Sequence, residues 1–171
     1  DARQVFQEAA AKDPDFAMVH YQLALNSPSA KEFRAHLDRA VALADQASEG
    51  ERLLILSLQA GADANPAKSL DYAREAAAKY PDDPRVHTTL GNSYFFGQQD
   101  YQKARDELQK AIDEVGATCT EAKAAPDEND TIREERLRTL AEGGFNPVIG
   151  IGFIYSPAAA KVAAEYPDTN F

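Results

Sequence analysis

The stretch PRVHTTLGNSYFFGQQDYQKARDELQKAIDE (residues 84–114) contains two helical patterns separated by a short turn with a glycine. The pair Leu90-Gly91 in its first half follows the pair Leu56-Ser57 by 34 residues, and that pair follows Leu23-Ala24 by 33 residues. Recurrence at such an interval is typical of repeat proteins, in which each unit buries its apolar face only by stacking on the next. The stretch therefore predicts an array of helix pairs whose last helix ends at Glu114.

A second pattern of apolar and small residues lies between these pairs. Four sets share the spacing i, i+4, i+7, which places their members on one face of a helix. The sets are Ala2/Phe6/Ala9, Phe33/Leu37/Ala40, Ser69/Ala73/Ala76 and Ala104/Leu108/Ala111. Small residues on such a face let a neighbouring helix pack closely, and Pro14 and Pro81 end two of these helices before the next pair begins.

The unit 84–114 resembles the tetratricopeptide repeat (TPR). It has one extra residue in its turn, and Gly116 stands where the family has a closing proline. The resemblance covers residues 1–114 and implies one lone helix at about residues 2–13, followed by three helix pairs. The family's characteristic positions are occupied by Leu90, Gly91, Tyr94, Tyr101, Ala104, Leu108 and Ala111.

The resemblance implies a binding scaffold without chemistry of its own. In such arrays the first helices of the pairs line a concave groove that receives an extended peptide or a partner helix, so a protein or peptide partner is expected. Alternatively, the aromatic residues only pack between helices. Arg85 and Asn92 alone fit the family's variant that captures a C-terminal carboxylate. The groove positions implied are Tyr21, Gln22, Leu54, Leu58, Arg85, Thr88, Asn92 and Phe96.

Composition and isolated motifs exclude several classes of function. The net charge of −10 disfavours nucleic acid as a partner, and no apolar run is long enough to span a bilayer, so direct membrane insertion is not expected. The single cysteine, Cys119, excludes an internal disulfide. His20, His36 and His87 lie on different repeats, so no metal site is expected. No cofactor motif or catalytic motif is present, and we expect no enzymatic activity.

Residues 115–171 have a different pattern, which predicts a partial α/β segment of the order β-α-β-α. The stretch 116–125 is strand-like, 131–144 is helical, and 145–153 is a continuous apolar run typical of a strand buried on both faces. A second helix is predicted over 156–167. The chain is therefore expected to be mainly α, with a helix-turn-helix solenoid over 1–114 and a partial α/β segment after it.

The stretch LAEGGFNPVIGIGFIYSPAAAKVAAEYPDTNF (residues 140–171) looks like the basic membrane protein family, the substrate-binding lipoproteins of ABC transporters similar to purine nucleoside receptors. That resemblance implies a fold like that of periplasmic binding proteins, with two lobes and a nucleoside or similar small solute in the cleft between them. It would place Gly152, Phe153, Tyr155 and Ser156 near the cleft. The Gly150-x-Gly152 turn is alternatively explained by tight packing, and it does not match a dinucleotide fingerprint.

Two expectations follow from these resemblances. The chain changes at Glu114–Val115 from one family to another, and each part is expected to be a fragment, as in a chimera, so the second part alone should not bind a nucleoside. Both resemblances lean towards a bacterial protein, in the periplasm or cell envelope rather than the cytoplasm. The leading hypothesis is a protein–protein interaction scaffold, and the alternative is a fragment of an ABC transporter's substrate-binding component.

Overall fold

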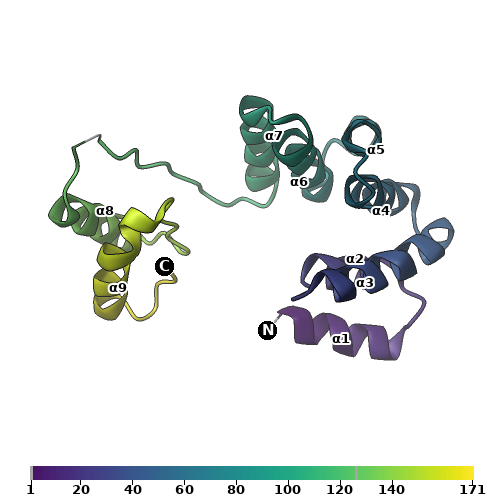
Figure 1. Cartoon of the computed structure of the whole chain (residues 1–171), viewed down its shortest axis with the longest axis horizontal. Helices are drawn as coiled ribbons and strands as arrows, with labels where there is room; N and C mark the ends of the chain where they lie inside the picture. Colours follow the sequence, from purple (N-terminus) through teal and green to yellow (C-terminus); the bar gives the residue numbers. More distant parts are fainter. Residues whose placement is uncertain (1, 126) are drawn as a thin grey trace. The chain divides into compact units, whose positions relative to one another are not determined.

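The computed structural model describes residues 2–125 and 127–171, and it is mainly α-helical (Figure 1). The chain divides into two compact units, Asp1–Cys119 (unit 1) and Thr120–Phe171 (unit 2). Helix α7 ends before this division, and the backbone then passes through Gly116 with φ of +68°, a left-handed conformation that glycine adopts without strain.

Unit 1 is a series of helices in which neighbours along the chain pack against one another. The pairs α2 and α3, α4 and α5, and α6 and α7 each form a helical hairpin, and α1 packs on α2 (Figure 1). The elements are α1 (Ala2–Lys12), α2 (Ala17–Leu25), α3 (Ala30–Leu43), the short 3-10 helix η1 (Ala44–Gln46), α4 (Glu49–Ala62), α5 (Pro66–Lys79), α6 (Pro84–Asn92), the π-helical turn η2 (Ser93–Gln98) and α7 (Tyr101–Glu114).

Side-chain caps set the starts of several of these helices. Ser48 and Glu51 form a capping box at α4, in which the side-chain oxygen of each residue accepts a hydrogen bond from the backbone N–H of the other. Asn65 and Asp83 each accept a backbone N–H of the first turn that follows, and each is succeeded by a proline at the first helical position. These capping residues and prolines, which can be read in the sequence, therefore fix where the short loops end and the next helices begin.

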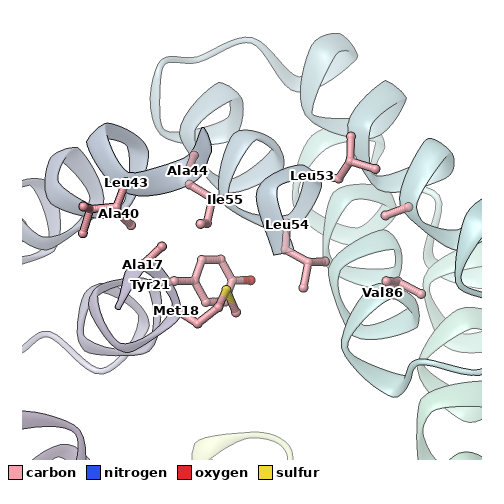
Figure 2. Packing of buried hydrophobic residues seen from close by; sticks show 11 residues of the cluster. Ala17, Met18, Tyr21, Ala40, Leu43, Ala44, Leu53, Leu54, Ile55 and Val86 are labelled. Atoms are coloured by element: carbon pink, nitrogen blue, oxygen red, sulfur yellow. The ribbon is translucent and has the colours of Figure 1, made fainter. Parts of the chain in front are cut away.

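The repeating small residues are the core of unit 1. Leu37, Ala40, Ala73 and Ala76 are all 0% exposed, and Ala104 is 1% exposed. One cluster joins α2, α3, η1, α4, α5 and α6, and Figure 2 shows Tyr21 of α2 close to Ile55 and Leu54 of α4. A second cluster joins α5, α6, η2 and α7. Burial of one apolar stripe per helix against its neighbours stabilises the array.

Unit 2 consists of α8 (Asp130–Glu142), the 3-10 helix η3 (Phe153–Tyr155) and α9 (Ser156–Glu165). Its small core contains Leu137 of α8, Val148, and Ala158 and Val162 of α9. The two α-helices pack against each other. Within residues 127–171 the prediction of helices is therefore confirmed.

The prediction of a β-α-β-α segment was wrong. Among the described residues the structure has no strand, and 117–125 and 145–151 have no helix either. The apolar run around Val148 was expected to be buried on both faces, but Ile149 is 72% exposed and Ile151 is 83% exposed. In the described part of this run, Val148 is the residue that donates a backbone hydrogen bond to a distant segment, to the carbonyl of Asn170 at 2.8 Å. A run of apolar residues makes a strand only where a neighbouring strand pairs with it.

Candidate functional site

A cavity of about 720 Å³ lies in unit 1 between the first helices of the three pairs. We call this cavity the groove. Its lining comes from α2, α4, the loop after α4, the start of α5, α6 and η2. The lining residues are Tyr21, Gln22, Leu25, Ser57, Leu58, Gly61, Ala62, Ala64, Pro66, Ser69, Arg85, Thr88, Thr89, Asn92, Ser93, Phe96 and Gly97.

The walls of the groove are apolar and partly open to solvent. Leu25 is 51% exposed and Phe96 is 78% exposed, although both are large hydrophobic residues. Phe96 lies in η2, and its ring contacts the ring of Phe95 edge to face, with centroids 4.8 Å apart. Tyr21 is nearly buried, and this burial raises the pKa of its hydroxyl, although a hydrogen bond with Thr89 opposes the shift. Exposed apolar walls of this kind favour an apolar ligand.

A ladder of three serines forms the floor of the groove. Ser57 of α4 donates to the carbonyl oxygen of Ser69 at 2.9 Å, and the hydroxyls of these two residues are 3.2 Å apart. The hydroxyl of Ser69 lies 3.4 Å from that of Ser93, which donates to the carbonyl of Thr89 at 3.0 Å. The ladder joins α4, α5 and η2, so it fixes the floor before any ligand arrives.

The charged end of the groove is occupied by an internal ion pair. The guanidinium of Arg85 forms a two-pronged contact with Asp83, with Nε–Oδ1 at 3.0 Å and Nη2–Oδ2 at 2.6 Å. Its Nη1 also lies 3.7 Å from Oε1 of Glu51. The hydrogen bonds with Arg85 lower the pKa of Asp83, and the same bonds raise the pKa of Arg85. Both groups are therefore charged at neutral pH, and each already has a partner.

The structure brings together most of the residues that the repeat pattern implies for the groove. Leu54 is the exception, because its side chain is 1% exposed and packs in the core with Val86 (Figure 2). Leu58, one turn later on the same face of α4, lies at the groove instead. The implied positions that line the groove are Tyr21, Gln22, Leu58, Arg85, Thr88, Asn92 and Phe96.

Several lining residues were not implied by the pattern. Ser69 and Pro66 belong to α5, a second helix, and the resemblance assigns only first helices to the groove. They reach the groove because α5 approaches η2 closely: a Cβ added to Gly97 would lie 3.1 Å from Cβ of Pro66. The small residues Gly61, Ala62 and Ser69, at the end of one helix and the start of the next, were the available signal in the sequence.

The residues of the alternative site lie in unit 2. Gly152 has φ of +106°, Tyr155 is half-buried against the small core, and Ser156 is exposed at the start of α9. The side chain of Phe153 lies outside the described part of the structure. A Cβ on Gly150 would lie 2.9 Å from Cβ of Tyr155, so this glycine permits a close backbone packing. Without the expected strands, these residues are not at the carboxyl ends of a sheet.

Two of the three histidines lie side by side. His20 and His36, on α2 and α3, stack with ring centroids 5.9 Å apart, so two of the three histidines lie closer than their sequence positions indicated. Burial, and then the neighbouring His20, lowers the pKa of His36. Within residues 2–125 and 127–171, no group of three or more His, Cys, Asp or Glu side chains is placed to hold a metal ion. Helices in these same ranges are also too short or too polar to cross a membrane.

No protein-family model matches this chain, and a search of curated proteins finds no match either. The geometry of the groove is therefore the basis for a functional assignment.

Proposed function

We propose that unit 1 is a TPR-like scaffold that binds a segment of a partner protein, as a peptide or a helix, in the groove. The observation that carries the proposal is that seven of the eight positions that the TPR resemblance implies for a groove line one cavity. These seven come from α2, α4, α6 and the π-helical turn η2. Residues that served only to stack neighbouring helices would not be expected to gather around one cavity.

The physical character of the groove supports the proposal. Phe96 is 78% exposed beside a hollow of about 720 Å³, and a large aromatic side chain in such a position gains stability when a partner covers it. The serine ladder holds the floor in place, so little ordering is needed on binding. The proposed role is binding and is not enzymatic.

The proposal is tested with a library of random peptides displayed on phage and selected on the full chain. The most enriched peptide is synthesised with a fluorescent label, and its Kd is measured by anisotropy. We expect Phe96→Ala to weaken binding about ten-fold or more, because buried aromatic anchors dominate such interfaces. We expect Asn92→Ala to cost about three-fold or less, the loss of one hydrogen bond.

Val5→Ala is the control, because Val5 is a hydrophobic residue that is 62% exposed on α1 and does not line the groove. Its removal should leave the Kd unchanged. Equal losses from Phe96→Ala and Asn92→Ala would argue for polar recognition instead. Failure to enrich any peptide would contradict the proposed function.

A further inference from the structure

A second, acidic cavity lies next to Arg85, which lines one end of the groove. This cavity has a volume of about 320 Å³ and is lined by Asp13, Asp15, Phe16, Ala17, Gln46, Ala47, Ser48 and Glu51. Glu51 also connects the two cavities, because it lies 3.7 Å from the groove residue Arg85. We call the residues Asp13, Asp15, Glu51 and Asp83 the acidic rim.

Helix α4 links the rim to the apolar part of the groove. Glu51 lies in its first turn, and Leu58 follows seven residues later, so the two side chains share one face of the helix. At a rise of about 1.5 Å per residue, they are separated by about 10 Å along the helix axis. The face of α4 thus changes from acidic to apolar over two turns.

The rim has more negative than positive charge. Its four carboxylates face two guanidinium groups, since Arg39 contacts Asp15 at 2.5 Å and Arg85 contacts Asp83 at 2.6 Å. The surplus is consistent with unit 1 as a whole, in which 13 basic residues stand against 19 acidic ones. The positive ends of α4 and α6 point to this end, but Glu51 and Asp83 already offset them.

The described lining of the groove is poorly suited to bind an anion. Among the described residues that line it, Arg85 is the one cation, and two carboxylates already occupy its guanidinium. A partner's carboxylate would have to displace Asp83, whose pKa the hydrogen bonds with Arg85 lower. Displacement would leave a charged side chain without its partner, which is costly in a half-buried site.

We infer that the partner segment has two parts, an uncharged apolar stretch that fills the groove and Lys or Arg side chains about 10 Å further along that meet the acidic rim. The end of the segment that lies nearest the acidic rim carries no free terminal carboxylate. This inference rests on the proposed function of the groove and specifies the chemistry of the partner. Complementary charge at the rim selects among apolar segments, because an acidic one is repelled there.

Three synthetic peptides test the inference. All have the core Leu-Leu-Ala-Leu-Leu, are acetylated and amidated, and differ only in the two residues added at each end, which are Lys, Gln or Glu. Their affinities for the full chain are measured by fluorescence anisotropy. We expect the Lys peptide to bind about three-fold more tightly than the Gln peptide, as for an exposed ion pair, and the Glu peptide to bind most weakly.

The matched variants are Glu51→Gln and Asp71→Asn. Glutamine can keep the capping box with Ser48, so the fold of α4 is retained while one rim charge is removed. Asp71 is an exposed acid on α5 that lines neither cavity. We expect Glu51→Gln to weaken the Lys peptide about three-fold and to leave the Gln peptide unchanged, whereas Asp71→Asn should change neither.

The outcomes separate the inference from the proposed function. Equal affinity of the three peptides, or tighter binding of the Glu peptide, would overturn the inference and leave the groove's proposed function intact. The same holds if Phe96→Ala does not weaken the Lys peptide, because that peptide would then bind elsewhere on the acidic surface. If none of the three peptides binds, both the inference and the proposed function are contradicted.

Discussion

Gly91 of α6 lies directly against Leu108 of α7. A Cβ added to Gly91 would be 2.8 Å from Cγ of Leu108 and 3.2 Å from the carbonyl oxygen of Ala104. Real Cβ atoms are not found as near to another carbon as 2.8 Å, so only glycine permits this approach. The contact fixes the distance between the two helices of the last pair, and α6 carries the groove residues Arg85, Thr88 and Asn92.

Gly91→Ala is therefore expected to destabilise unit 1. Because the added methyl group meets a packed side chain and backbone, we expect a loss of about 1–3 kcal/mol in the free energy of unfolding. Urea denaturation followed by circular dichroism measures it. Gly61→Ala is the matched control, since its nearest contact is an ordinary 3.6 Å to Ser69 Oγ. Alanine is the better helix former, so this control should be neutral or stabilising, and an equal loss from both variants would contradict the argument.

The ionised carboxylate of Glu107 links α7 to α6. Nδ1 of His87 lies 2.7 Å from Oε2 of Glu107, and Nζ of Lys110 donates to Oε1 at 2.9 Å. Burial raises the pKa of Glu107, but the hydrogen bonds with Lys110 and His87 outweigh burial, and the net pKa is lower than usual. A carboxyl with a lower pKa in the folded state contributes stability above its unfolded pKa, and this contribution is lost as the pH falls through the folded value.

We expect Glu107→Gln to cost about 1–3 kcal/mol of unfolding free energy at pH 7, the range for hydrogen bonds to a charged group. The difference between the two proteins should shrink as the pH falls below the usual carboxyl pKa of 4.5, because the unfolded wild type then binds a proton before the folded protein does, and it should vanish once Glu107 is protonated in the folded protein too. Urea midpoints at a series of pH values measure the effect, with Asp71→Asn as the control for one lost negative charge. A difference that stays constant down to pH 2 would show that the charge of Glu107 is not what stabilises the pair.

The segment 117–125 is the expected site of first proteolysis. It has no regular secondary structure, and its side chains, including Lys123, are exposed. Proteases cleave exposed, irregular backbone in preference to packed helices. Limited trypsin digestion should therefore cut first at Lys123 and leave an N-terminal fragment with a helical circular dichroism spectrum. First cuts within residues 17–111 would mean that the helix pairs are less stable than their packing indicates.

The sequence predicted the helical part well because its spacing reflects packing. The sets that include Ala40, Ala73 and Ala104 repeat at helical intervals, and those residues are buried where helices meet. The pattern could not separate Leu54 from Leu58, since both lie on one face of α4 and only the packing of neighbouring helices buries the first. It also could not predict that the extra residue in the turn after α6 is accommodated as a π-helical turn that carries Phe96.

The sequence misled in unit 2 because an apolar run does not specify its own partner. Val148 is buried, whereas Ile149 and Ile151, which alternate with glycines, are exposed. The run also contains Pro147, which has no N–H for a sheet ladder. Short apolar runs are ambiguous by periodicity alone, and a strand needs pairing from elsewhere in the chain. That information is absent from the run itself.

The most direct test of the account is a map of amide chemical shifts by nuclear magnetic resonance on the full chain, with and without the peptide selected on it. The central claim is that three first helices form one binding groove. We predict shifts that cluster in 21–25, 58–62 and 88–97, with the outward faces of α3 and α7 unaffected. Shifts confined to α3, α7 or unit 2 would contradict the claim.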